Sequence, residues 1–339
     1  MKKLRIFYYP NGKTFSYGYF KNRALATYSY FTRSPTNYAF PTKLHIEITN
    51  VCNLGCIMCP RSYMSRKKGM MDMELFKKII DESKGKVEFV YLHLFGEPLM
   101  HPHIIDMIKY CKNAGIFTGL ATNATLLNNA KSKEIANSGL DFMVISFDGV
   151  NKEEYEKIRQ GSSYEKTLKN IKGFLQIKGR KPHTVLQLIY MNFTKDKIKE
   201  YTNFWTSYNI EAVRIKPLQT WSGEIENINE LSTKEYSMGE KPCDRPWRHL
   251  CILWDGTATP CEFDFDGAYP LGNIREKSIE EIWNSDRVIQ LRKLHIAQKR
   301  NEVKLCKSCT YQAPNIFENV ALTMLDVLTA TKLISDMGK

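Results

Sequence analysis

The sequence predicts an α/β protein in which a partial (β/α)6 barrel of the TIM type precedes a small α+β domain. Between residues 43 and 216, two kinds of segment alternate regularly. Short runs that are apolar, or that alternate apolar with polar residues, are typical of strands, and the longer amphipathic segments between them are typical of helices. After residue 230 this pattern ends, and five of the nine cysteines occur from position 243 onward. Six strands are fewer than the eight of a closed barrel, so we expect an open barrel with its functional groups at the carboxyl ends of the strands.

Six strands and five helices make up the predicted barrel. The strands are expected at 43–49, 88–95, 116–121, 141–147, 184–191 and 211–216. The helices are expected near 72–83, 103–114, 128–137, 164–178 and 194–208. Asp72 precedes the first of these helices and is a suitable N-cap, because its carboxylate can accept a hydrogen bond from the first turn.

Alternation along the strands predicts a polar barrel interior, because residues that point outward must meet the covering helices. The outward-facing residues of the first and sixth strands are apolar: Leu44, Ile46, Ile48, Val213 and Ile215. Their inward-facing neighbours are polar: His45, Glu47, Thr49, Arg214 and Lys216. We expect Arg214 and Lys216 to hold an anionic group inside the barrel. The alternative is that the inward charges pair with one another.

The predicted chain has four regions. A basic, aromatic extension at 1–40 precedes the barrel at 41–235, and the small domain spans 236–312. Within the small domain, Trp254-Asp255-Gly256-Thr257 is typical of a turn between two short strands, and helices are expected near 278–284 and 286–298. Residues 313–339 contain a last helix.

The two ends of the chain suggest contact either with a membrane surface or with the barrel. Residues 1–40 contain basic and aromatic residues and no acidic one, which suits peripheral contact with anionic headgroups. The alternative, which we favour, is that both ends pack against the open barrel. The apolar residues of the last helix lie on more than one of its faces, which is typical of burial in protein.

Charge and cysteine content limit the class of protein. The net charge of +13 indicates an anionic partner, but no recognition motif supports a specific nucleic acid. The chain shows no secretory signal at its start, so we expect a cytoplasmic protein whose clustered cysteines bind metal or act in catalysis. Cys111 and Cys251 lie within an apolar helix and strand, and we expect them to be buried.

Three cysteines follow the first predicted strand with the spacing C-x3-C-x2-C: Cys52, Cys56 and Cys59. Three thiolates on one loop suit a cubane iron–sulfur cluster, whose irons prefer soft sulfur ligands. Three ligands for four irons leave one iron open to a cofactor or substrate. Zinc is the alternative, but zinc sites usually take four ligands in two separated pairs, and no histidine completes this loop.

This loop resembles the signature of the radical S-adenosylmethionine (SAM) superfamily, and the resemblance extends over residues 41–312. Motifs at the ends of the later predicted strands also resemble those of the superfamily. They are Phe95-Gly96-Glu97-Pro98, Thr122-Asn123 and Ser146-Phe147-Asp148-Gly149. The resemblance implies SAM binding by Gly96, Glu97, Asn123, Ser146 and Asp148. Two positions depart from the family pattern. Ala124 replaces a frequent glycine, and Met58 replaces an aromatic residue that commonly packs near adenine.

The resemblance also implies a reaction. SAM would bind the open iron, and the reduced cluster would cleave it to a 5′-deoxyadenosyl radical that abstracts hydrogen from a substrate. The protein would then supply position and exclusion of water. An electron donor such as flavodoxin or ferredoxin is expected to reduce the cluster.

The later cysteines resemble the SPASM domain found in this superfamily. The matching positions, Cys243, Cys261, Cys306 and Cys309, supply four ligands for one auxiliary [4Fe–4S] cluster. A full SPASM domain binds two auxiliary clusters and needs more cysteines, so the chain resembles the shortened form called twitch. Zinc held by the same four thiolates is the alternative.

The pattern is similar to that of twitch dehydrogenases, which implies oxidation of a small alcohol or sugar-like molecule with help from the auxiliary cluster. Glu262 and Asp264 are the candidate groups for taking a substrate proton, with Asp266 close by in sequence. A solvated acidic loop is the alternative for these residues. A peptide-modifying enzyme is the second candidate function, and a metal-binding protein without turnover is the third. Residues 1–40 are too few for a typical leader-peptide domain, which favours the small molecule.

Overall fold

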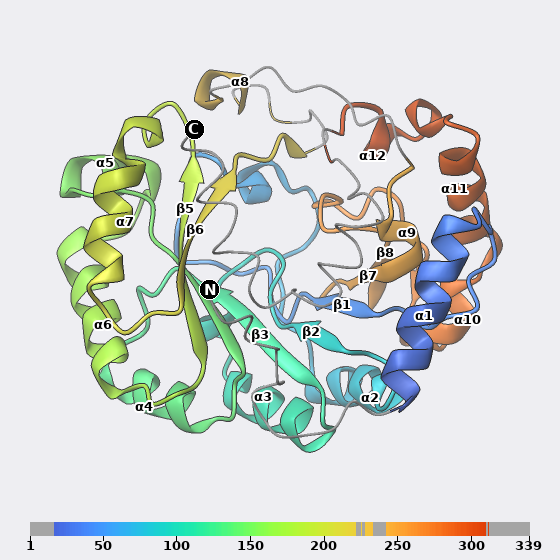
Figure 1. Cartoon of the computed structure of the whole chain (residues 1–339), viewed down its shortest axis with the longest axis horizontal. Helices are drawn as coiled ribbons and strands as arrows, with labels where there is room; N and C mark the ends of the chain where they lie inside the picture. Colours follow the sequence, from blue (N-terminus) through green and yellow to red (C-terminus); the bar gives the residue numbers. More distant parts are fainter. Residues whose placement is uncertain (1–16, 222–224, 226–227, 233–241, 310, 312–339) are drawn as a thin grey trace, which may run out of the picture.

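The computed structural model describes residues 17–221, 225, 228–232, 242–309 and 311. Within these residues the strands form a nine-stranded sheet with the order β6-β5-β4-β3-β2-β1-β7-β8-β9 (Figure 1). The strands are β1 (Lys43–Ile46), β2 (Phe89–Tyr91), β3 (Phe117–Thr122), β4 (Phe142–Ser146), β5 (His183–Tyr190), β6 (Ala212–Pro217), β7 (His249–Ile252), β8 (Thr257–Thr259) and β9 (Gly272–Asn273).

The first six strands confirm the predicted barrel. Each runs parallel to its neighbours, and each overlaps the range expected from the sequence. Leu44, Ile46 and Ile48 are fully buried in the core between the sheet and the covering helices. On the opposite face of β1, the ring of His45 stacks on Tyr91 of β2, with centroids 4.7 Å apart. The alternation of outward apolar and inward polar residues is therefore confirmed for this strand.

The sheet continues beyond the barrel. β7 pairs in parallel with β1, from Lys43 opposite His249 to Ile46 opposite Ile252. β8 and β9 then add antiparallel strands, and the predicted turn at 254–257 lies between β7 and β8. The regions that the sequence assigns to a barrel and to a small domain thus share one sheet, which fixes the second cysteine set relative to the first.

Helices cover the outer face of the curved sheet (Figure 1). Those of the barrel are α2 (Met73–Ser83), α3 (Ile104–Asn113), α4 (Asn129–Asn137), α5 (Lys152–Ile158), α6 (Tyr164–Ile177) and α7 (Ile198–Thr206). Asp72 caps α2 as predicted, since its carboxylate accepts a hydrogen bond from the Leu75 amide at 2.8 Å. No helix was predicted at α5, and α7 begins later than expected because Lys195–Lys197 form a 3-10 turn.

Five further helices accompany the second half of the described chain. They are α8 (Ile228–Leu231), α9 (Arg245–Arg248), α10 (Ile279–Trp283), α11 (Asp286–Ile296) and α12 (Lys304–Lys307). Two of them, α10 and α11, confirm the helices expected near 278–284 and 286–298.

Part of the basic extension forms a helix that packs on the second half of the chain. Within α1 (Tyr17–Phe31), the Tyr30 hydroxyl donates a hydrogen bond to the Pro242 carbonyl at 2.8 Å. The same ring lies edge-on to Trp247, with centroids 5.6 Å apart. Residues 1–16 and the predicted last helix lie outside the described residues.

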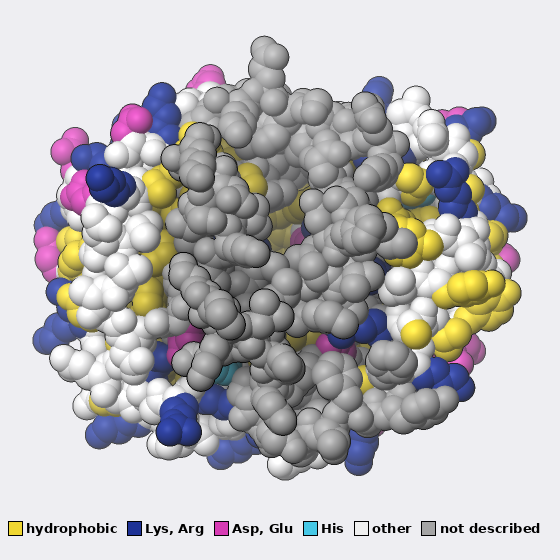
Figure 2. Space-filling model, viewed as in Figure 1, with side chains coloured by type: hydrophobic (Ala, Val, Ile, Leu, Met, Phe, Trp, Pro, Cys, Tyr) yellow, Lys and Arg dark blue, Asp and Glu magenta, His cyan; other side chains and the backbone are white. Residues whose placement is uncertain are grey.

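Among the residues that the structure describes, no helix combines the length and the apolar character that a membrane crossing requires. Figure 2 shows Lys and Arg side chains around the rim of one face, interspersed with other described residues.

Candidate active site and iron–sulfur centres

The first cysteine loop leaves the carboxyl end of β1 and is held at the end of α5. The backbone N–H of Gly55 donates to the Gln160 carbonyl at 2.9 Å, and that of Ile57 donates to the Ile158 carbonyl at 3.1 Å. Cys52, Cys56 and Cys59 are all partly exposed. Burial raises the pKa of the Cys59 thiol to about 11, so a thiolate at this position needs a metal to stabilise it.

Two side chains donate toward the sulfurs of this loop. The Arg159 guanidinium lies 3.7 Å from Cys56 Sγ, and the Asn123 amide nitrogen lies 3.9 Å from Cys52 Sγ. Asp148 is fully buried and pairs with Arg159, whose Nε is 2.8 Å from the carboxylate. A fixed cation and an amide dipole beside the thiols suit the negative charge of an iron–sulfur cluster. Asp148 therefore holds the Arg159 guanidinium in place.

Gly96 and Glu97 bring the end of the second strand against the cysteine loop. Gly96 has φ +84°, and a Cβ at this position would lie 2.5 Å from the Thr49 carbonyl oxygen, so only glycine fits. Glu97 is 2% exposed, and its carboxylate accepts hydrogen bonds from the Thr122 hydroxyl at 2.6 Å and from the backbone N–H of Asn123 at 2.8 Å. Burial raises the pKa of Glu97, and these hydrogen bonds oppose the rise. The carboxylate is thus fixed beside the first cysteine loop.

The remaining SAM-binding candidates lie at neighbouring strand ends. Asn123 follows β3, and its side-chain amide donates to Asn53 in the cysteine loop at 3.1 Å. Ser146 is the last residue of β4 and is partly exposed. Ala124 has φ +60°, which explains the frequent glycine at this position of the motif. Its side chain is fully buried in the core, so the methyl group gains packing that offsets part of the backbone strain.

Met58 lies in an apolar cluster at the same end of the barrel. It is 4% exposed and packs with Ile158, Met191 and Leu218. Its carbonyl accepts a hydrogen bond from the Trp221 indole at 2.9 Å. The ring of Trp221, in the segment after β6, therefore contacts this loop. No local motif in the sequence predicted this contact.

The second cysteine set surrounds one cavity. Cys243, Cys261, Cys306 and Cys309 line it together, and Cys251 is not among the lining residues. Burial raises the pKa of Cys261 to about 12, and two guanidinium groups, those of Arg245 and Arg300, share the cavity wall. Four convergent thiols with cations beside them fit a closed [4Fe–4S] cluster. Cys251 and Cys111 are fully buried, as expected.

The acidic residues after Cys261 have three different surroundings. Glu262 is 22% exposed at its side chain and forms an ion pair with Arg245. Asp264 is buried, and its carboxylate accepts hydrogen bonds from the backbone amides of Ala268 and Tyr269 at 2.7 and 3.0 Å. Asp266 accepts hydrogen bonds from Ser65. The carboxylate of Asp264 thus stabilises the loop that carries it, whereas that of Glu262 pairs with the side chain of Arg245.

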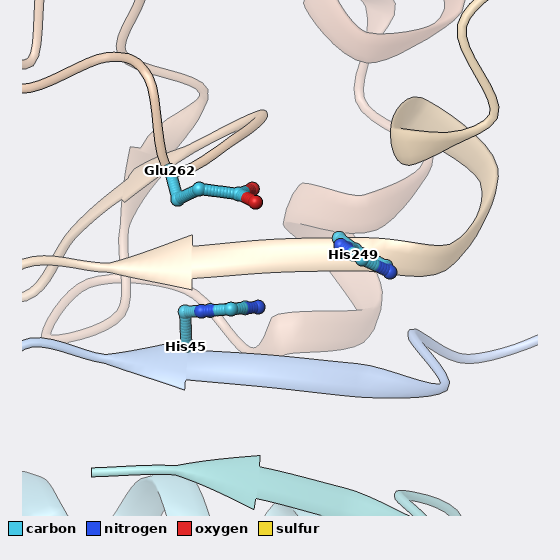
Figure 3. Close-up of side chains that lie close together, drawn as sticks. All are labelled: His45, His249 and Glu262. Carbon is cyan, nitrogen blue, oxygen red and sulfur yellow. The ribbon is translucent and has the colours of Figure 1, made fainter. Parts of the chain in front are cut away.

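Glu262 meets two histidines that sequence reasoning did not bring together. Figure 3 shows Glu262 beside His45 of β1 and His249 of β7, and their ligand atoms all lie within 4.8 Å of one another. Such a trio can hold a metal ion, but here the carboxylate is already paired with Arg245. Burial and the charges of Arg245 and Lys43 lower the pKa of both histidines, so the imidazoles are neutral at pH 7. This arrangement favours a polar substrate group over a cation.

Cations face the same interior from β6. Arg214 is exposed and Lys216 is half-buried. Burial, followed by the charges of Lys216 and Arg214, lowers the pKa of His93 to about 3. Burial, followed by the repulsion of Arg214 and Arg245, lowers the pKa of Lys216 to about 8. The positive charge of these side chains makes this part of the interior suited to an anion.

Comparison with known families agrees with this geometry. A family model described as the radical SAM superfamily matches residues 46–204. A second model, SPASM, described as an iron–sulfur cluster-binding domain, matches residues 243–310. The chain thus carries a radical SAM domain followed by a SPASM domain. Its cofactors are SAM, a SAM-binding [4Fe–4S] cluster and an auxiliary [4Fe–4S] cluster, and the thiols described above fit both clusters.

Two relatives align with most of the length of this radical SAM enzyme. The tungsten-containing aldehyde ferredoxin oxidoreductase cofactor-modifying protein of Pyrococcus furiosus is 27% identical over 288 residues, covering 72% of this chain and 81% of the relative. The S-adenosyl-L-methionine-dependent 2-deoxy-scyllo-inosamine dehydrogenase of Niallia circulans is 22% identical over 284 residues, covering 78% of this chain and 91% of the relative.

Solved structures confirm the predicted fold. BtrN in complex with AdoMet and 2-DOIA matches with a TM-score of 0.56 at 19% identity, covering 80% of this chain and 93% of BtrN. Streptococcus suis SuiB bound to S-adenosylmethionine matches with a TM-score of 0.62 at 17% identity, covering 80% of this chain and 72% of SuiB. At these identities the likeness concerns the fold.

Proposed function

We propose that this enzyme oxidises a small anionic molecule, an alcohol or a sugar-like compound, with the auxiliary cluster as electron acceptor. The observation that carries the proposal is the barrel interior. Arg214 and Lys216 of β6 lie on the face of the sheet opposite the core, as does the neutral imidazole of His45. SAM and its cluster supply a hydrogen-abstracting radical when bound. The name of the Niallia circulans relative, a dehydrogenase of an inosamine, supports a small-molecule substrate.

Arg214 and Lys216 would bind the anionic group of the substrate. Their mutual repulsion is relieved by a negative charge, so binding is favoured when Lys216 is protonated. A phosphate or carboxylate held there would leave the rest of the molecule free to extend toward His45 and Tyr91, which stack on β1 and β2.

Oxidation of an alcohol to a carbonyl removes two hydrogens from the substrate. The first leaves the carbon as a hydrogen atom, and the second leaves oxygen as a proton while one electron passes to the auxiliary cluster. Glu262 would accept that proton, because it lies next in sequence to Cys261 and faces His45 and His249. Asp264 is less suited to this role because backbone amides already occupy its carboxylate.

The electron for the first cluster would come from a flavodoxin or ferredoxin. We place the reaction in the cytoplasm, because two clusters need reduced thiols as ligands.

The test is an anaerobic screen with a chemical reductant and SAM. Phosphorylated and carboxylated alcohols, deuterated at the carbinol carbon, should increase 5′-deoxyadenosine formation and transfer deuterium to it. Matched uncharged alcohols should be much poorer substrates. Turnover that requires a peptide, with no response to any small anion, would instead identify a peptide-modifying enzyme.

A further inference from the structure

His295 lies between two ligands of the auxiliary cluster. It is 2% exposed, belongs to α11 and lines the same cavity as Cys243 and Cys306. Its Nδ1 is 3.4 Å from the backbone nitrogen of Cys243, and its Nε2 is 3.5 Å from Cys306 Sγ. One imidazole therefore joins ligands that lie far apart in the sequence.

The first contact determines where the imidazole proton lies. The backbone N–H of Cys243 donates to Nδ1, so Nδ1 must be unprotonated. A neutral imidazole then carries its hydrogen on Nε2, which is the nitrogen that faces Cys306 Sγ. The geometry thus gives the Cys306 sulfur an N–H donor.

The helix that carries His295 is held firmly at this place. Arg292, one turn earlier in α11, is fully buried and donates hydrogen bonds to the carbonyls of Pro246 and Trp283, each at 2.9 Å. It also donates to Asn284 Oδ1 at 2.8 Å. These bonds fix α11 against the segment that follows Cys243, so the imidazole cannot easily move away from either ligand.

We propose that His295 donates an N–H···S hydrogen bond to the Cys306 thiolate and thereby raises the reduction potential of the auxiliary cluster. A hydrogen bond to a ligating sulfur withdraws electron density and stabilises the more negative, reduced cluster. A higher potential suits a cluster that accepts an electron from a substrate, and this link to function is the part that rests on the proposed oxidation. The hydrogen bond and its effect on the potential do not depend on it.

Two substitutions separate the two contacts of His295. In His295→Gln, the amide can place an N–H near the former Nε2 and keep the bond to Cys306. In His295→Asn, the shorter side chain can accept the Cys243 N–H but does not reach Cys306. Both are made in full-length protein in which Cys52, Cys56 and Cys59 are replaced by Ala, so that only the auxiliary cluster contributes an electron paramagnetic resonance (EPR) signal.

The measurement is a redox titration followed by EPR, without SAM or substrate. At the midpoint potential of the reference protein, His295→Asn should lower the ratio of reduced to oxidised cluster about three- to tenfold, the effect of one hydrogen bond. Tenfold corresponds to about 59 mV for a one-electron couple. His295→Gln should stay within about twofold of the reference. Equal potentials in Asn and reference proteins, or equal losses in Asn and Gln, would overturn the proposal.

A second measurement needs no substitution at His295. With 15N-labelled histidine, the reduced auxiliary cluster of the reference protein should show hyperfine coupling to a histidine nitrogen. Its absence would also overturn the proposal, even if the His295 variants fail to assemble a cluster. Failure of the substrate screen would leave both results unchanged, so the two proposals can fail separately.

Discussion

Replacing Gly96 by Ala should disrupt the contact between the end of the second strand and the first cysteine loop. The added Cβ would lie 2.5 Å from the Thr49 carbonyl oxygen and 2.8 Å from the Val51 carbonyl oxygen. Both are backbone atoms, so no side chain can rotate away to make room. The backbone at Gly96 has φ +84°, which also disfavours any L-residue.

The expected loss of stability combines two effects. The left-handed conformation costs an L-residue about 1–2 kcal/mol, and overpacking against fixed atoms adds about 1–3 kcal/mol. We therefore expect the free energy of unfolding to fall by about 2–5 kcal/mol. The same displacement stretches the hydrogen bond from the Glu97 amide to the Val51 carbonyl, now 2.9 Å, and moves the Glu97 carboxylate. Loss of one hydrogen bond to a charged group would weaken SAM binding about ten- to a hundredfold.

Urea unfolding of the anaerobic protein measures the first effect, and the change in the EPR spectrum on titration with SAM measures the second. Gly55→Ala is the matched control, because it lies in the same cysteine loop and its added Cβ would meet nothing within 4 Å. If Gly96→Ala behaves like Gly55→Ala in both assays, the close approach of Gly96 to the loop does not position SAM.

Three further predictions concern the clusters, the interior charge and the fold. Reconstituted protein should hold about eight irons per chain. Replacing Cys243 and Cys261 by Ala should lower the iron content to about four while SAM cleavage persists. Zinc in place of the lost iron would contradict this assignment of the second cysteine set. Affinity for a substrate anion should fall as pH rises through about 8, because Lys216 then loses its charge. Lys216→Arg should remove that decline, and a decline that persists would exclude Lys216 as its cause. Arg292→Met should lower stability by about 3 kcal/mol in a urea melt, because buried acceptors lose their partners, and an unchanged midpoint would refute this.

The barrel could be predicted from the sequence because its signals are local. A strand such as β1 alternates Leu44 and Ile46 with polar residues, and each such run is followed by an amphipathic helix. The pairing of β7 with β1 carries no such signal. It depends on register between strands far apart in the sequence, where Lys43 lies opposite His249. The helix α1 was missed for a related reason, since its place depends on contacts such as that of Tyr30 with Pro242.

The residues of the candidate site also fall into two groups, those with a local sequence signal and those brought together only by the fold. Cys52, Cys56 and Cys59 could be found because the loop carries all three at a fixed spacing, and Gly96 and Glu97 form a short motif. Groups that come together only through the sheet could not be found. His249 and Glu262 meet His45 because β7 and the turn after β8 lie beside β1. His295 has no motif at all, and only the packing of α11 places it on the second cysteine set.

The shared sheet also explains how one substrate can lie between two clusters. The first cysteine loop follows the carboxyl end of β1, whereas Cys243 precedes the amino end of β7, which runs parallel to β1. The two cysteine sets therefore lie toward opposite ends of β1, a strand of four residues. His45, in the middle of that strand, faces the interior between them. A substrate beside His45 would meet the SAM-binding end on one side and the auxiliary cluster on the other, as hydrogen abstraction followed by electron transfer requires.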